Sequence, residues 1–154
     1  QQLQAKIGSG LTPEEFRARA ARNAIGHVGL GESAALLADS LGWPWDNIEQ
    51  SIEPVIADVA VKTEYFEVQP GQVRGQAQKL RLTAPQGVIE LELTMALDEP
   101  SLDAVRVEGE PPVDMVIQGG IHGDRATAGT VVNFVASCVQ AAPGLRTVTD
   151  VPLS

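Results

Sequence analysis

The centre of the chain, residues 55–118, alternates between apolar and polar positions, which is the period of a β-strand. The alternation is clearest in residues 88–97, where the polar face carries Glu90, Glu92 and Thr94. The apolar face of the same segment consists of Ile89, Leu91, Leu93, Met95 and Leu97. We therefore predict an amphipathic strand over residues 88–97.

The segment before this strand is its predicted partner. Residues 79–83 alternate between leucine and polar residues, and Pro85-Gln86-Gly87 supplies the turn between the two strands. The leucine faces match only when paired residue numbers sum to an odd value, so sums of 171 or 173 place Arg81 opposite Glu90 or Glu92. Either ion pair is exposed and contributes less than about 1 kcal/mol, so it adjusts register more than stability.

Two further strands are predicted at residues 102–108 and 113–118. The break Glu110-Pro111-Pro112 separates them, because proline cannot donate to a strand ladder. Together with the two strands before them, they predict a mostly antiparallel or mixed sheet.

Helical signals precede this strand-rich centre. Thr12-Pro13-Glu14-Glu15 is a capping box with proline at the first helical position, which predicts a helix from residue 13 to about residue 24. The apolar spacing of residues 32–41 predicts a second helix. A short third helix is predicted over residues 46–52, with Pro54 ending it.

The last long helix is predicted from Asp124 to about Gln140. Its apolar face consists of Val131, Phe134, Val135, Cys138 and Ala142. An amphipathic helix buries such a face, so we expect this helix to cover the apolar side of the sheet, with Cys138 in the core. The order of elements predicts an α+β fold, a sheet covered by helices, in a single domain over residues 1–154.

Composition and charge exclude several classes of partner. The net charge is −9 and the isoelectric point is near 4.6, whereas nucleic acid and anionic membranes require a basic face. No apolar run approaches the roughly 20 residues that span a bilayer. The single Cys138 cannot close an internal disulfide, which indicates a cytoplasmic protein. Neither histidine combines with carboxylates in a ligand spacing, so we expect no metal site.

The strongest candidate for ligand binding is VDMVIQGGIHGDRATAGTVVNFV, residues 113–135, where a strand passes through glycines into a helix. Glycines allow the backbone to approach a ligand closely, and a helix N-terminus offers unpaired N–H groups to an anion or a polar substrate. His122 is therefore a candidate ligand contact beside Asp124. In the alternative interpretation Asp124 caps the helix and His122 lies on the surface without a role.

A second group of candidates lies near the end of the first helix. Asn23 is a polar residue that could reach the same pocket, and His27 is a weaker candidate, more typical of a packed structural histidine. Gly29 to Ala34 matches GxGxxA, a form of the dinucleotide fingerprint, but a helix and not a strand is predicted before it. We therefore interpret these glycines as a helix-to-helix corner and expect no cofactor-binding residue there. Ser33 lacks the GxSxG context of a serine hydrolase.

Several motifs together resemble a known family. They are KIGSGLTPEEF (6–16), GHVGLGESAALLADSLGW (26–43), IEPVIA (52–57), GDRATAGTVVNFV (123–135) and APGLRTVTDVP (142–152). This set is similar to the C-terminal domain of 2,4-diaminopentanoate dehydrogenases and related amine dehydrogenases, which are themselves similar to dihydrodipicolinate reductase. The resemblance covers nearly the whole chain.

The resemblance implies a two-domain oxidoreductase that acts on CH–NH2 groups with NAD or NADP. An N-terminal Rossmann domain would hold the cofactor, and this chain would be the substrate-binding and oligomerisation domain, binding no cofactor by itself. The chain begins with Gln1 and reaches a helix start at Thr12, which favours a piece of a longer polypeptide over a processed protein. A homodimer or higher homo-oligomer through the sheet is expected.

By the same resemblance, His122 and Asn23 would orient a small amine, ketone or amino-acid-derived substrate, with His27 a third choice. The pair of histidines followed by lysine that dihydrodipicolinate reductases use is absent, and no catalytic residue is assigned within this chain. Two alternatives stay open. One is a reductase of the same architecture acting on another substrate, and the other is a non-catalytic dimerisation or interaction module.

Overall fold

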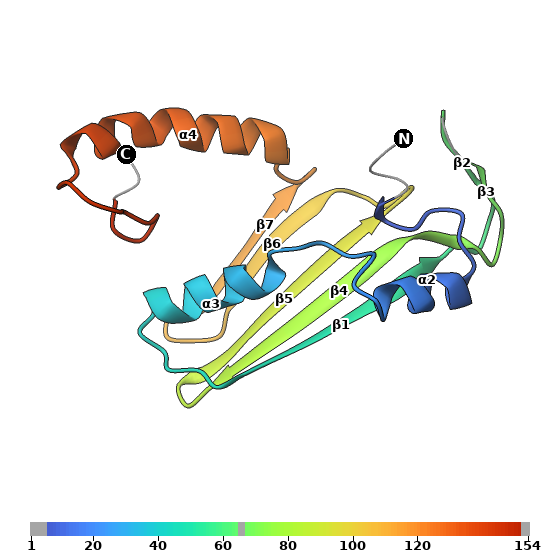
Figure 1. The fold of residues 1–154 in the computed structure, drawn as a ribbon, viewed down its shortest axis with the longest axis horizontal. Helices are drawn as coiled ribbons and strands as arrows, with labels where there is room; N and C mark the ends of the chain where they lie inside the picture. Colours follow the sequence, from blue (N-terminus) through green and yellow to red (C-terminus); the bar gives the residue numbers. More distant parts are fainter. Residues whose placement is uncertain (1–5, 65–66, 152–154) are drawn as a thin grey trace. The chain divides into compact units, whose positions relative to one another are not determined.

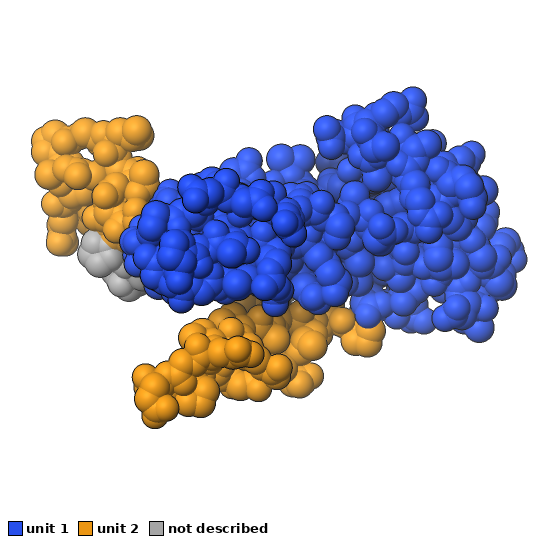
Figure 2. All heavy atoms as spheres, turned by 90° about the horizontal axis from the view of Figure 1, so that it is seen from below, with its two compact units in different colours: residues 1–99 blue, residues 100–154 orange. Residues whose placement is uncertain are grey.

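The computed structural model describes residues 6–64 and 67–151. Its contacts divide the chain into two compact units, residues 1–99 and residues 100–154, which are coloured separately in Figure 2. That residues 1–154 form a single domain stays a prediction. Each unit has its own antiparallel strands and at least one helix, so the α+β fold class is confirmed.

A three-stranded antiparallel sheet forms the centre of the first unit. Its strands are β1 (Asn47–Ile56), β4 (Val73–Ala84) and β5 (Gly87–Ala96), in the order β1-β4-β5 (Figure 1). Arg81 lies opposite Glu90, and the two side chains form an ion pair. Of the two predicted registers, the one that joins these residues is therefore confirmed.

The short helix predicted over residues 46–52 is wrong, because these residues form the first part of β1. Ile48 and Ile52 are four residues apart, a spacing that fits both a helix face and one side of a strand. In the sheet they lie opposite Leu82 and Gln78 on the covered side. Pro54 is tolerated because β1 is an edge strand of this three-stranded sheet.

The first predicted helix begins where the capping box places it. Helix α2 spans Pro13–Ala20, and the Thr12 hydroxyl accepts a hydrogen bond from the Glu15 N–H over 3.2 Å. The Glu15 carboxylate in turn accepts from the Thr12 N–H over 3.0 Å. The helix ends earlier than predicted, because the chain leaves helical geometry and Asn23 adopts a left-handed φ of 54°.

Helix α3 spans Leu30–Ser40 and ends in a Schellman motif. The Trp43 N–H donates to the Ala38 carbonyl over 2.9 Å and the Gly42 N–H to the Asp39 carbonyl over 3.1 Å. Gly42 has φ 65°, the left-handed geometry that this ending requires. The motif turns Trp43 back onto the sheet, where its ring covers Gly87 at the start of β5.

The main core lies between α3 and the sheet, since α3 packs on β4 and β5 (Figure 1). Its fully buried members are Ala34, Ala38, Leu80, Leu82 and Ala84. Partly buried side chains around them include both tryptophans and Ile89. Helix α2 contacts β1 and buries Phe16, so in this unit the two N-terminal helices pack on the sheet.

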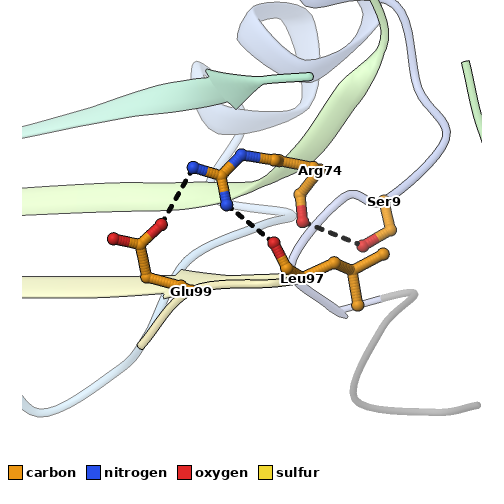
Figure 3. A network of polar contacts seen from close by, with 4 residues as sticks. All are labelled: Ser9, Arg74, Leu97 and Glu99. Carbon is orange, nitrogen blue, oxygen red and sulfur yellow. Dashed lines mark hydrogen bonds and ion pairs between the residues drawn. The ribbon is translucent and has the colours of Figure 1, made fainter. Parts of the chain in front are cut away.

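A polar network fixes the end of the first unit (Figure 3). The Arg74 guanidinium donates to the Leu97 carbonyl over 2.6 Å and pairs with the Glu99 carboxylate over 2.9 Å. The hydroxyl of Ser9, which is buried, lies 3.5 Å from the Arg74 carbonyl. One arginine thus joins the N-terminal segment, β4 and the residues that lead out of β5.

The connection from β1 to β4 contains a small hairpin that the alternation did not single out. Its strands are β2 (Val61–Lys62) and β3 (Glu67–Val68). Two hydrogen bonds of 2.8 Å, from Ala57 N–H to the Gln72 carbonyl and from Gly71 N–H to the Ala57 carbonyl, join the base of this connection.

The second unit consists of a hairpin and a helix. Strands β6 (Leu102–Val107) and β7 (Val113–Gln118) and helix α4 (Gly123–Gln140) lie within one residue of their predicted bounds. Strands β6 and β7 pair with each other in an antiparallel sheet within this unit, and one sheet through both units stays a prediction. No helix in the described part of the chain has the length and apolarity needed to cross a bilayer.

That the last helix covers the apolar side of the sheet stays a prediction. No residue of α4 is buried, and Cys138 is exposed. Val131 and Val135 of the predicted apolar face are 62% and 58% exposed in the structure. The helical period of this segment is confirmed by α4.

Candidate functional site

The strand-to-helix turn that carries His122 depends on two left-handed glycines. Gly119 and Gly120 have φ values of 81° and 68° and lie between the end of β7 and the start of α4. His122 is the N-cap of α4, and its carbonyl accepts a hydrogen bond from the Ala126 N–H over 3.0 Å. Its imidazole makes no capping hydrogen bond and is exposed, so the side chain is available to a ligand.

Asp124 does not cap this helix, contrary to one of the two interpretations of the motif. It lies in the first turn of α4, where a carboxylate interacts favourably with the helix dipole. The helix starts one residue earlier than predicted, which moves the N-cap position to His122.

A carboxylate that the sequence did not single out fixes the same turn. Asp103, near the start of β6, accepts a hydrogen bond from the Ile121 N–H over 2.6 Å. Glycine is favoured at position 120 by its φ of 68°, and a Cβ added there would also lie 3.3 Å from the same carboxylate oxygen. The Ile121 N–H is therefore occupied by an internal anion, and the turn is less suited to an external anion than the glycine pattern indicates.

Asn23 and His27 lie together in the loop of residues 21–29, between α2 and α3. Both side chains are exposed. The imidazole of His27 is exposed, so the interpretation of His27 as a packed structural histidine is wrong for its side chain. Its main chain, however, is held from beneath by the sheet.

The holding group is the side-chain amide of Gln78, in the middle of β4. Its oxygen accepts from the His27 N–H over 2.5 Å, and its nitrogen donates to the His27 carbonyl over 3.2 Å. Gln78 and its neighbour on the same face, Gln76, are 2% and 1% exposed. The strand alternation contains a signal for them, because residues 76 and 78 have the same parity as the buried leucines 80 and 82.

The structure thus brings two of the three predicted substrate residues into one loop. Asn23 and His27 belong to the first unit and His122 to the second. Their convergence on one substrate stays a prediction. A loop, not a strand, precedes Gly29, which is the N-cap of α3 with φ 108°, so the helix-to-helix corner is the correct interpretation of the GxGxxA match.

Two depressions of the surface lie away from these residues. One, of about 410 Å³, is on the polar face of the three-stranded sheet and is lined by Glu49, Gln50, Ser51, Lys79, Leu80, Arg81, Glu90, Leu91 and Glu92. The other, of about 240 Å³, is near the end of α4 beside Asp150. Within residues 6–64 and 67–151, no group of three or more histidine, cysteine or acidic side chains is arranged to hold a metal ion.

Comparison with known proteins identifies relatives along the whole chain. The 2,4-diaminopentanoate dehydrogenase C-terminal domain family matches residues 2–154. The 2,4-diaminopentanoate dehydrogenase of Acetoanaerobium sticklandii is 33% identical over 159 aligned residues, which cover 95% of this chain and 44% of that protein. The chain therefore spans less than half the length of this relative.

A solved structure shows the same fold. The amine dehydrogenase from Mycobacterium smegmatis superposes with a TM-score of 0.79 at 24% identity, covering 100% of this chain and 47% of that one. Together with the match over residues 2–154, this shows that the resemblance seen in the motifs extends through both units. The chain belongs to the family of 2,4-diaminopentanoate dehydrogenase C-terminal domains.

Proposed function

We propose that the protein containing this chain is an NAD(P)-dependent oxidoreductase acting on CH–NH2 groups, an amine or diamine dehydrogenase. The carrying observation is membership of the 2,4-diaminopentanoate dehydrogenase C-terminal domain family over residues 2–154. The 33% identity to a 2,4-diaminopentanoate dehydrogenase supports the same substrate class.

In this proposal the chain supplies the substrate-binding and oligomerisation part, and a different segment of the protein binds NAD or NADP. The GxGxxA match does not fit a dinucleotide, because a loop precedes it and Gly29 serves as a helix cap. The expected result of calorimetric titration is that this chain alone shows no binding of NADH or NADPH. Micromolar binding to the isolated chain would refute this division.

His122 and Asn23 are the proposed substrate contacts, with His27 as a third. Each side chain is exposed, and each main chain is held in place, by a helix cap at His122 and a left-handed turn at Asn23. An imidazole and an amide can both hydrogen-bond an amine or imine nitrogen and orient it for reaction. No group of this chain is assigned a proton-transfer or covalent role.

The test is amine-dependent reduction of NAD⁺ or NADP⁺ by the complete protein, with 2,4-diaminopentanoate as the first substrate. His122→Ala and Asn23→Ala should each lower kcat/KM at least about tenfold. Asn47→Ala, an exposed asparagine at the start of β1, is the matched control and should leave kcat/KM unchanged. Unchanged kinetics in both site variants would refute the assignment.

A control substrate separates the proposal from its alternatives. Turnover of a carbonyl substrate without ammonia would support a reductase of another substrate. A complete protein that turns over no amine or carbonyl but self-associates would support a non-catalytic dimerisation module.

The single cysteine is consistent with the cytoplasm, which we propose as the compartment.

Self-association through the three-stranded sheet is the second part of the proposal. The face opposite α3 is exposed and carries both signs of charge, with Lys79 and Arg81 of β4 beside Glu90 and Glu92 of β5. A second copy can present the opposite charge to each position, so we expect a homodimer or higher oligomer by sedimentation. Replacing Lys79 and Arg81 together by glutamate should give the monomer mass, and an unchanged mass would exclude this face.

A further inference from the structure

Two glutamines occupy positions on β4 where apolar side chains are the rule. Gln76 and Gln78 are 1% and 2% exposed and share a face of the strand with Leu80 and Leu82, which are 2% and 0% exposed. Long polar side chains are rarely buried to this degree unless their hydrogen bonds are satisfied. Their partners therefore indicate what these two residues do.

Gln78 hydrogen-bonds both main-chain polar groups of a single residue 51 positions away. Its amide oxygen accepts from the His27 N–H and its amide nitrogen donates to the His27 carbonyl, over 2.5 and 3.2 Å. A carboxamide can satisfy a donor and an acceptor on one residue at the same time, as a neighbouring strand does. An apolar residue at position 78 would leave both groups of His27 without these partners.

The chain passes close to the sheet at this point. Gly26 has φ 125°, and a Cβ added to it would lie 3.2 Å from the Ile52 side chain and 3.8 Å from both polar atoms of the Gln78 amide. Gly26 thus allows the loop to approach Gln78 closely. The Gln76 amide nitrogen also donates to the Gln78 oxygen over 3.3 Å, a longer contact than the 2.5 Å bond from the His27 N–H to the same oxygen.

We infer that Gln78 is a positioning residue for substrate binding, which it controls by clamping the main chain of the loop that carries Asn23 and His27. The inference rests on the proposed function. The start of the loop is held by the end of α2, since the Asn23 N–H donates to the Ala20 carbonyl over 2.9 Å. At the other end of the loop, the Gln78 amide holds the main chain of His27. Gln78 itself is buried beneath the loop and does not touch substrate.

Gln76 provides a matched control on the same strand and face. Its amide oxygen is buried and has no hydrogen-bond partner among the described residues, and its amide nitrogen donates to Gln78, not to the loop. Gln76→Met therefore changes the same kind of core position as Gln78→Met without removing a bond to His27. The two variants have equal chemistry and burial but different contacts.

The experiment measures loop order and turnover separately in the complete protein. In Gln78→Met, the His27 amide proton should exchange with solvent at least about tenfold faster than in the wild type, because its acceptor is lost. The amides of Leu80 and Leu82 should stay protected. Gln76→Met should leave His27 exchange within about threefold of the wild type.

Two kinetic quantities are measured separately, kcat/KM for the amine and KM for the cofactor. Gln78→Met should lower kcat/KM for the amine at least about tenfold and leave the KM for NAD⁺ or NADP⁺ within about twofold. If Gln78→Met does not fold, Gln78→Asn serves in its place. It keeps a neutral carboxamide but is shorter by one methylene, so its amide cannot reach both polar groups of the His27 main chain and the same changes are expected.

The outcomes distinguish this inference from the proposed function. Unchanged His27 exchange in Gln78→Met overturns the clamp, whatever the enzyme turns over. Faster exchange with unchanged kcat/KM in an active amine dehydrogenase overturns the positioning role alone. A wild-type protein that oxidises no amine overturns the proposed function, and the positioning role for that substrate falls with it, while the exchange result still decides whether the clamp exists.

Discussion

The Asp103 carboxylate accepts a hydrogen bond from the backbone N–H of Ile121 over 2.6 Å, which joins the start of β6 to the turn before α4. Asp103 pairs with Ile117 in the hairpin, so its side chain lies at the point where β7 gives way to Gly119 and Gly120. A charged acceptor on a backbone N–H is stronger than a neutral one. The main-chain position of the turn before His122 therefore depends on a residue from a different strand.

Asp103→Ala should loosen this turn and leave the hairpin paired. The Ile121 amide should exchange about tenfold faster, the equivalent of about 1.4 kcal/mol for a lost hydrogen bond to a charged group. Asp103→Asn keeps an oxygen acceptor and should show a smaller change. Exchange measured by NMR gives both values residue by residue.

The control for this prediction is Asp114→Ala, on the partner strand of the same hairpin. Asp114 pairs with Arg106 over 3.1 Å, and both side chains are more than half exposed. Such an exposed pair contributes about 0 to 1 kcal/mol and holds no turn amide. If Asp114→Ala accelerates Ile121 exchange as much as Asp103→Ala does, the effect belongs to the hairpin as a whole.

The capping box of α2 should contribute measurably to the stability of the first unit. Thr12→Ala removes the acceptor of the Glu15 N–H and should lower the free energy of unfolding by about 1 kcal/mol. Glu14→Ala, in the same first turn but outside the box, should cost less. Urea unfolding of both variants checks this, and equal effects would show that the box adds nothing beyond first-turn charge.

Local patterns predicted the elements whose determinants are close in sequence. The capping box places the start of α2 correctly because all its partners lie within four residues. The alternation around the β4–β5 turn fixed the register to two choices, since a slip by one residue would expose the leucine face. In both cases the residues that form the sequence pattern are the same residues that make the contacts in the structure.

Elements whose determinants are distant could not be predicted in this way. The helix predicted over residues 46–52 rested on local signals, a cap near Asp46 and a stop at Pro54, whereas pairing with the distant β4 makes residues 47–52 a strand. The bond between Gln78 and His27 spans 51 positions and leaves only a parity signal in the strand.

Gly75→Ala should be among the most destabilising single-methyl substitutions in the sheet. A Cβ at Gly75 would lie 2.2 Å from the Met95 carbonyl oxygen and 2.3 Å from the Ala96 Cα, so the backbones of β4 and β5 would have to separate. Overpacking of this kind costs about 1 to 3 kcal/mol or more. Thermal unfolding should show a clearly lower Tm.

Gly31→Ala is the matched control for Gly75→Ala. Gly31 lies in α3, and nothing lies within 4 Å of a Cβ built on it. Alanine is favoured over glycine in a helix by up to about 1 kcal/mol, so this variant should be as stable as the wild type or more so. A loss of stability equal to that of Gly75→Ala would mean that steric contact is not the cause.

Lys79 should have a pKa above its ordinary value of 10.5. Its ammonium group donates to the Glu92 carboxylate over 2.7 Å, and the hydrogen bond and the charge of Glu92 both raise the pKa of Lys79. A group whose pKa is higher in the folded state contributes stability below its unfolded pKa and loses that contribution as pH rises through the folded value. The stabilising contribution is therefore present in full below a pH of about 10.5, and only its loss occurs above that pH. NMR titration of the Lys79 side chain should give a midpoint above 10.5 in the wild type and a lower one in Glu92→Gln. Because the pair is exposed, 1 M salt should reduce the difference between the two midpoints. Equal midpoints in the wild type and Glu92→Gln at low salt would show that Glu92 does not hold the Lys79 ammonium in solution.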